Sequence, residues 1–133
     1  MKSRKLNIGI WIAQGFLILA MLFFGIMKII TPYEESVAHP NGAWMADFSP
    51  NQIAIIGILE ILGVVGLLLP YLTKRLKMLV PIAAIALAIT LAGGVFTHVL
   101  RGENFAPPFI LMIIALIVAF GRKEMLRFKT TSN

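Results

Sequence analysis

Four long apolar runs, separated by short segments that carry nearly all of the charge, limit what this chain can fold into more than any other feature. A helix needs roughly 20 apolar residues to cross a hydrocarbon core of about 30 Å. We place four spans of about this length at residues 8–30, 53–72, 79–100 and 105–121. Continuous apolar runs without alternation are typical of helices and not of β-barrels. The sequence therefore predicts an all-α integral membrane protein, a four-transmembrane-helix bundle.

These spans and their connectors use almost all of the 133 residues, so we expect a single membrane domain over residues 1–133. Only 14% of the residues are charged, against about 25% in soluble domains. The first run is too long for the apolar region of a signal peptide, and we expect it to be retained. The net charge of +6 comes from residues that flank apolar runs, which indicates the lipid bilayer, and no nucleic acid, as the partner. The absence of cysteine excludes disulfides and thiolate chemistry.

The distribution of Lys and Arg predicts the orientation of the bundle. Three clusters, at the N-terminus, in the second connector and in the tail, hold ten of the twelve: Lys2, Arg4, Lys5, Lys74, Arg75, Lys77, Arg122, Lys123, Arg127 and Lys129. Because cytoplasmic segments are enriched in these residues, we expect both termini inside (N-in/C-in) and the first connector outside.

That outer connector, residues 31–52, is long for so small a protein. Its aromatic residues Tyr33, Trp44 and Phe48 favour the headgroup region, and residues 39–42 (HPNG) form a turn signal. Two interpretations stay open: a lid over the outer mouth of the bundle, or a loop anchored by its aromatic rings.

Ionisable residues inside spans are the main functional signal, because each costs a few kcal/mol at the centre of a membrane helix by insertion scales. Glu60 lies about 10 Å below the outer edge of its span. In the predicted topology Lys28 and His98 occupy the same outer half, with Arg101 one turn beyond His98. Glycines recur with Glu60 every three residues, at Gly57, Gly63 and Gly66, and would let another helix approach closely. We expect Lys28, Glu60 and His98 to point at one another.

Each of these residues also has a simpler interpretation. Lys28 and Glu60 could be a structural ion pair instead of a ligand or proton-handling site. Lys28 alone could extend to the headgroups, and His98 could be an interfacial hydrogen-bonding residue. Glu60, His98 and His39 are too few and too scattered for us to predict a metal site.

Several segments together resemble one known family. They are residues 25–28 (GIMK), 44–48 (WMADF), 56–63 (IGILEILG), 66–70 (GLLLP), 81–84 (PIAA), 97–98 (TH) with Arg101 and Glu103, and 121–122 (GR). The chain is similar to the DoxX-like family of small four-helix bacterial membrane proteins, although residues 107–108 (PP) depart from a more polar start of the last helix. The resemblance implies a location in the inner membrane and a polar centre of Lys28, Glu60, His98 and Arg101.

The family takes its name from a subunit of a thiosulfate:quinone oxidoreductase, so the resemblance implies a quinone as ligand and membrane redox-complex subunits as partners. We therefore hold two hypotheses. In the first, the protein is a subunit or small enzyme that handles a quinone in a polar pocket in the outer half of the membrane. In the second, it is a non-catalytic membrane anchor or scaffold whose polar cluster is purely structural. Whether it is an enzyme, and whether it forms a homo-oligomer, stays open.

Overall fold

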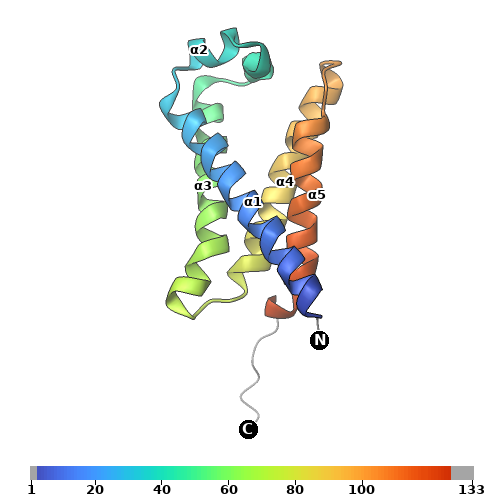
Figure 1. The fold of residues 1–133 in the computed structure, drawn as a ribbon. Coiled ribbons are helices and arrows are strands. Elements are labelled where there is room, and N and C mark those ends of the chain that lie inside the picture. The colour runs from blue at the N-terminus through green and yellow to red at the C-terminus, as the bar shows by residue number, and fades with distance from the viewer. Residues whose placement is uncertain (1–2, 127–133) are drawn as a thin grey trace.

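The computed structural model describes residues 3–126 and is helical along the chain (Figure 1). Its elements are α1 (Arg4–Ile30), α2 (Tyr33–Ala38), the 3₁₀ helix η1 (Pro40–Asp47), α3 (Pro50–Thr73), α4 (Leu79–Leu100), α5 (Ala106–Gly121) and the 3₁₀ helix η2 (Lys123–Leu126). No strand occurs between residues 3 and 126. The all-α prediction is confirmed, and each apolar run predicted from the sequence forms one helix.

The helices have the length and surface of membrane helices. Three of them, α1, α3 and α4, are long and apolar enough to cross a bilayer, whereas α5 has 16 residues and is shorter. Large apolar side chains such as Ile12, Leu19 and Phe120 are more than two-thirds exposed on the outside of the bundle. Such a surface requires a hydrocarbon environment, so the chain is a helical membrane protein.

Glycines bring the helices into close contact. A Cβ atom on Gly57 would lie 2.8 Å from the carbonyl oxygen of Gly25, so α1 and α3 approach to a distance that only glycine permits. Six and nine residues further along α3, Gly63 and Gly66 make room for Leu87 and Ala83 of α4. The small-residue stripe predicted in α3 therefore receives α1 near its start and α4 near its end.

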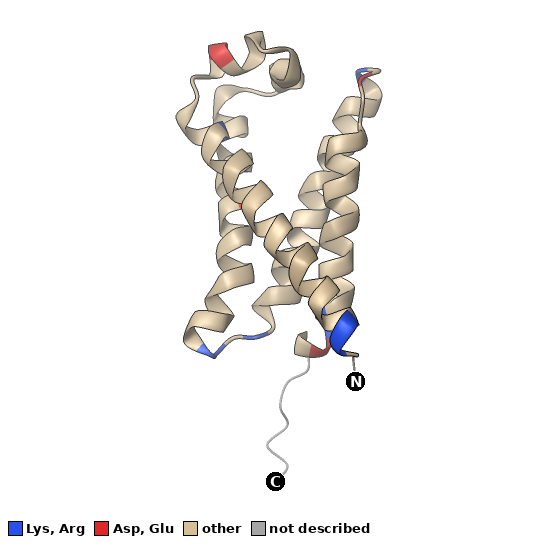
Figure 2. Ribbon diagram, in the orientation of Figure 1, with Lys and Arg blue, Asp and Glu red and all other residues tan. Residues whose placement is uncertain are grey.

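At one end of the molecule the long helices form two pairs, α1 with α3 and α4 with α5, and α1 crosses over to lie beside α5 at the other end (Figure 1). We call this end the basic end; it holds the start of α1, the α3–α4 connector and η2. The opposite end, which we call the loop end, holds α2, η1 and the α4–α5 turn. Lys and Arg gather at the basic end, and Figure 2 shows them at the start of α1 and in the connector. Lys2, Arg127 and Lys129, which also entered the predicted orientation, lie outside the described residues.

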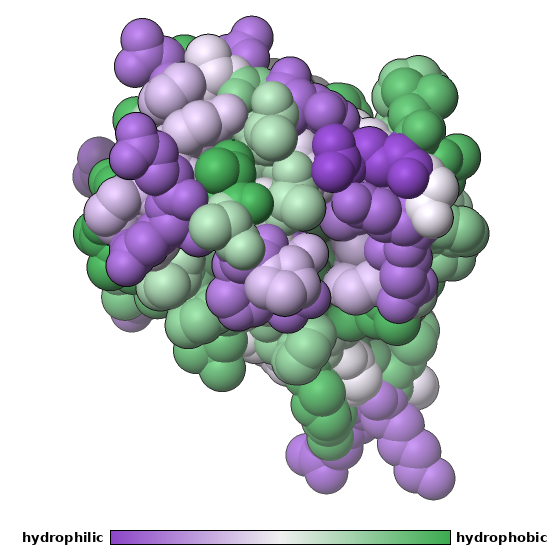
Figure 3. Space-filling view, turned by 90° about the horizontal axis from the view of Figure 1, so that it is seen from above, coloured by the Kyte–Doolittle hydropathy of each residue, from purple (hydrophilic) through white to green (hydrophobic). Residues whose placement is uncertain are grey.

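The first connector folds into a compact structure, which we call the lid (residues 33–48). A Cβ on Gly42 would overlap the backbone carbonyl of Ser36, so α2 and η1 can pack together only with glycine at this position. The Tyr33 hydroxyl donates to the carbonyl oxygens of Met45 (3.3 Å) and Phe48 (2.6 Å). These hydrogen bonds hold the lid together internally, and the lid lies over the loop end, where Figure 3 shows hydrophilic residues around apolar ones.

Candidate functional site

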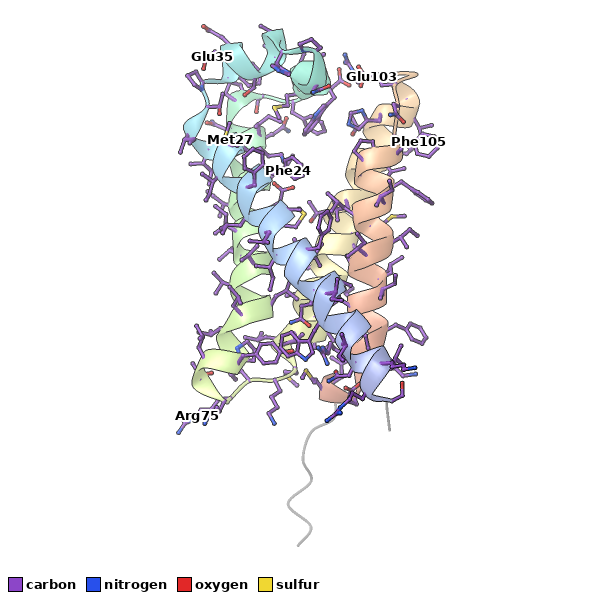
Figure 4. The ribbon with its side chains drawn as sticks, in the orientation of Figure 1. Phe24, Met27, Glu35, Arg75, Glu103 and Phe105 are labelled. Carbon is purple, nitrogen blue, oxygen red and sulfur yellow. The ribbon has the colours of Figure 1, made fainter. Side chains whose placement is uncertain are left out.

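A cavity of about 760 Å³ lies at the loop end, between the two helix pairs. Its deeper wall is apolar and includes Met21, Leu91 and Leu111, all of which are buried. Polar side chains are concentrated toward the lid, which contributes Trp44 and Phe48 to the lining. Figure 4 shows side chains projecting into the space between the two pairs, with Phe24 of α1 beside it. The cavity is therefore amphipathic, with an apolar interior and a polar end.

Lys28 and Glu60 form an ion pair at the wall made by α1 and α3. The Lys28 Nζ–Glu60 Oε1 distance is 2.8 Å, and only 9% and 5% of the two side chains is exposed. Lys28 lies three residues after Gly25, and Glu60 lies three residues after Gly57. The close contact of the two glycines therefore also brings the two charges together. A lysine and a carboxylate at this depth compensate each other, because an unpaired charge there would be costly.

Two aromatic rings complete the surroundings of the lysine. Its Nζ lies 5.7 Å from the centre of the Phe24 ring and 5.8 Å from that of Trp44. These distances are within the range of cation–π attraction. Lys28 is thereby held between its own helix, the carboxylate of α3 and the lid.

The turn after α4 builds a second polar group. Gly102 has a positive φ of 68°, and the amide of Glu103 donates to the carbonyl of His98 (2.9 Å) while that of Gly102 donates to Val99 (3.1 Å). This pattern is a Schellman motif, which glycine at the C′ position favours. The reversed chain brings the Glu103 carboxylate to 3.0 Å from Nδ1 of His98.

Arg101 links this turn to the lid. Its Nε donates to Glu103 Oε2 (3.0 Å), and its Nη1 donates to Asp47 Oδ1 (2.8 Å) at the end of η1. The hydrogen bond from Arg101 holds the pKa of the Glu103 carboxyl below its usual value, and the same bond raises the pKa of Arg101. Both groups therefore stay charged at neutral pH, and the ion pairs tie the lid to the second helix pair.

The structure brings the four candidate residues together only in part. Lys28 and Glu60 point at each other as expected, but His98 is paired with Glu103 and not with Glu60. Trp44 stands between the two groups, with its ring 5.9 Å from that of His98. Lys28, Glu60 and His98 all line the cavity, whereas Arg101 does not and instead contacts the lid. Trp44 and Glu103 are the participants whose contacts sequence reasoning did not predict.

A comparison with protein-family models gives the same relationship as the motifs. The model of the DoxX-like family matches residues 12–120, which include the cavity and all four candidate residues. The chain belongs to the DoxX-like family. Comparisons with curated proteins and with solved structures give no significant match. Within residues 3–126 of this DoxX-like protein, no group of three or more His, Cys, Asp or Glu residues could hold a metal ion.

A second buried polar group lies at the basic end of this DoxX-like bundle. Arg122 is only 4% exposed, and its Nε donates to Oε1 of the fully buried Gln14 (3.0 Å). The guanidinium also contacts the Asn7 side chain (3.0 Å) and lies 4.6 Å from the Trp11 ring. The sequence predicts Arg122 only as a member of the positively charged flank of the last span. The sequence feature that indicates a buried polar contact here is Gln14, the one polar side chain in an otherwise apolar stretch of α1.

A layer of buried apolar side chains separates the two polar groups. Leu17 and Met21 of α1, Val64 and Leu67 of α3 and Leu87 of α4 are each at most 3% exposed and belong to one core. This layer closes the cavity toward the basic end. The described residues therefore form a closed-bottomed pocket and not a continuous polar path through the bundle.

Proposed function

We propose that this DoxX-like protein binds a membrane-dissolved ring compound of the quinone class in the cavity at the loop end, as a subunit or small enzyme of a membrane redox system. The observation that carries the proposal is the cavity itself. Its volume of about 760 Å³ falls within the roughly 300–1,000 Å³ of small-molecule sites, which are mostly apolar with a few placed polar groups.

The polar end of the cavity offers complementary groups to a ring that carries oxygen atoms. The Lys28 ammonium donates to Glu60 and retains further protons for a ligand oxygen. His98 uses Nδ1 toward Glu103, which leaves Nε2 for a ligand. Trp44 provides an aromatic face for stacking. In this arrangement Glu60 is the carboxylate placed to exchange a proton with the ligand.

The proposal includes four spans with both termini on the cytoplasmic side of the inner membrane. The Lys and Arg residues at the basic end support that orientation. With 16 residues α5 extends about 24 Å, somewhat less than an average hydrocarbon core, and local thinning of the bilayer accommodates such a difference at a modest cost. The lid and the cavity then face the outer leaflet.

The two tryptophans give a direct test. Trp44 lines the cavity, whereas Trp11 lies at the basic end next to Arg122. Trp11→Phe leaves only the Trp44 emission, and Trp44→Phe leaves only that of Trp11. We expect decyl-benzoquinone to quench the first variant in liposomes with a saturable curve, and the second only in proportion to its concentration in the lipid. Curves of the same non-saturable form in both variants would refute the proposal.

The alternative function, a scaffold for another membrane protein, is favoured by one observation. Lys28 and Glu60 already satisfy each other in a direct contact, next to the glycine contact that joins α1 and α3. A purely structural pair predicts that Lys28→Met together with Glu60→Gln leaves partner association and cellular phenotype unchanged. Loss of phenotype with normal protein levels would exclude this alternative.

A further inference from the structure

We propose that the ligand enters the cavity sideways from the bilayer, through an opening between α3 and α4 whose edge is formed by Gly93. The inference rests on the proposed function, because it describes the route to the same cavity. It adds the chemical requirement that the ligand be neutral and dissolved in the hydrocarbon phase.

The residues that line the cavity on α4 show where it opens. Gly93 lines the cavity and is exposed, and no heavy atom of another element lies within 4 Å of where its Cβ would be. Ile89, one turn earlier, also lines the cavity and is 68% exposed. An apolar residue of a membrane helix that lines the cavity and is this strongly exposed indicates an opening of the cavity toward the lipid. Ile56 of α3, which is partly exposed, lines the cavity as well.

The course of the two helices explains the opening. α3 and α4 are in close contact where Gly63 and Gly66 receive Leu87 and Ala83. From that contact the two helices separate toward the loop end (Figure 1). Gly93 lies six residues beyond Leu87 on α4, in the separated part, and carries no side chain that could cover the space. On the α1 side of the cavity the Phe24 ring, which is also exposed, fills part of the space with a side chain, whereas Gly93 has none.

The lid covers part of the route from water, although Asn41 and Asn104 at the polar end line the cavity and are exposed. Trp44 and Phe48 of the lid line the cavity from above, and their rings pack edge to face with centres 5.9 Å apart. The Asp47–Arg101 ion pair fastens this part of the lid to the end of α4. A ligand arriving from water meets the polar end and the lid, whereas a molecule in the bilayer meets the apolar side chains of Ile56 and Ile89 beside Gly93.

The test measures rates of entry with the Trp44 signal. In a Trp11→Phe background in liposomes, stopped-flow quenching by decyl-benzoquinone gives association and dissociation rates. Gly93→Leu narrows the opening, and we expect both rates to fall about tenfold with a nearly unchanged Kd, because an obstacle on the path raises the barrier in both directions. Gly15→Leu is the matched control, since Gly15 also has no atom within 4 Å of its Cβ position but does not line the cavity.

A second variant distinguishes the two routes. Asp47→Asn weakens the link between the lid and α4 and should leave the association rate unchanged if entry is lateral. Unchanged rates in Gly93→Leu, or faster association in Asp47→Asn, would overturn the lateral route while the binding site stands. Absence of saturable quenching in the parent protein would overturn the proposed function together with the route. If Gly93→Leu does not fold, Gly93→Ala and Gly93→Ser must show graded slowing, and rates equal to the parent would refute the inference.

Discussion

Removing the positive charge of Lys28 should destabilise this protein far more than removing both members of the ion pair. With a separation of 2.8 Å and an effective dielectric constant of about 20, the attraction between Lys28 and Glu60 is about 6 kcal/mol. Most of that attraction only offsets the loss of hydration, which is several kcal/mol for each buried ion. The net value of the pair is therefore small, but each partner alone is costly.

For Lys28→Met we expect a loss of about 3–5 kcal/mol in the free energy of unfolding, because Glu60, only 4% exposed, is left without its counter-charge. Lys28→Met combined with Glu60→Met should come within about 1 kcal/mol of the parent, since two methionines fill a similar volume without charge. The assay is equilibrium unfolding in mixed micelles at pH 7 for the parent, both single variants and the double variant. A cost below about 1 kcal/mol for Lys28→Met, or a double variant as unstable as the sum of the singles, would refute the reasoning.

Three further predictions concern packing, pH and the basic end. Gly57→Ala puts a methyl group 2.8 Å from a carbonyl oxygen of α1 and should cost about 1–3 kcal/mol in the same unfolding assay, whereas Gly93→Ala, which meets no atom within 4 Å, should cost less than half of that. The guanidinium of Arg101 lowers the pKa of Glu103 on folding, so the stabilising contribution of Glu103 is present above about pH 4.5 and is lost as the pH falls through its folded-state pKa. Glu103→Gln should therefore remove this acid dependence from the unfolding midpoint. A pH profile of stability identical to that of the parent would contradict the prediction. Arg122→Lys should destabilise the protein nearly as much as Arg122→Met, by about 1–3 kcal/mol. The reason is that one ammonium group cannot reach both the Gln14 and the Asn7 side-chain oxygens that the guanidinium contacts. Full stability of the lysine variant would show that only the charge matters.

The helices and the Lys28–Glu60 contact could be predicted because local sequence determines both. The apolar runs set the positions of α1, α3, α4 and α5, and the charges between them set the connectors. Gly57 and Glu60 are three residues apart on one helix, as are Gly25 and Lys28 on another, so two glycines in contact bring the charges together. Spacing within each helix, together with the position of Lys28 and Glu60 in the same half of the predicted bundle, was therefore the basis of this prediction.

The partner of His98 and the burial of Arg122 could not be predicted in the same way. His98 contacts Glu103 because Gly102 reverses the chain after α4. The faces of the helices had indicated Glu60 as its partner, but the turn brings the carboxylate of Glu103 to the imidazole instead. Arg122 follows the last apolar run, a position that usually faces lipid headgroups. It is buried because the end of α5 packs against the start of α1, where a side chain on Gly121 would overlap Ile10. Because that contact joins helices at opposite ends of the chain, no local pattern in the sequence indicates it.

The central claim, that the cavity at the loop end is a binding site for a ring compound, is tested most directly by an experimental structure of the protein in lipid with decyl-benzoquinone. The account predicts density for a flat ring between Trp44 and His98, with an oxygen atom within hydrogen-bonding distance of Lys28 Nζ or His98 Nε2 and the alkyl chain leading toward Gly93. A closed cavity, or one that holds only a lipid acyl chain at saturating quinone, would contradict it.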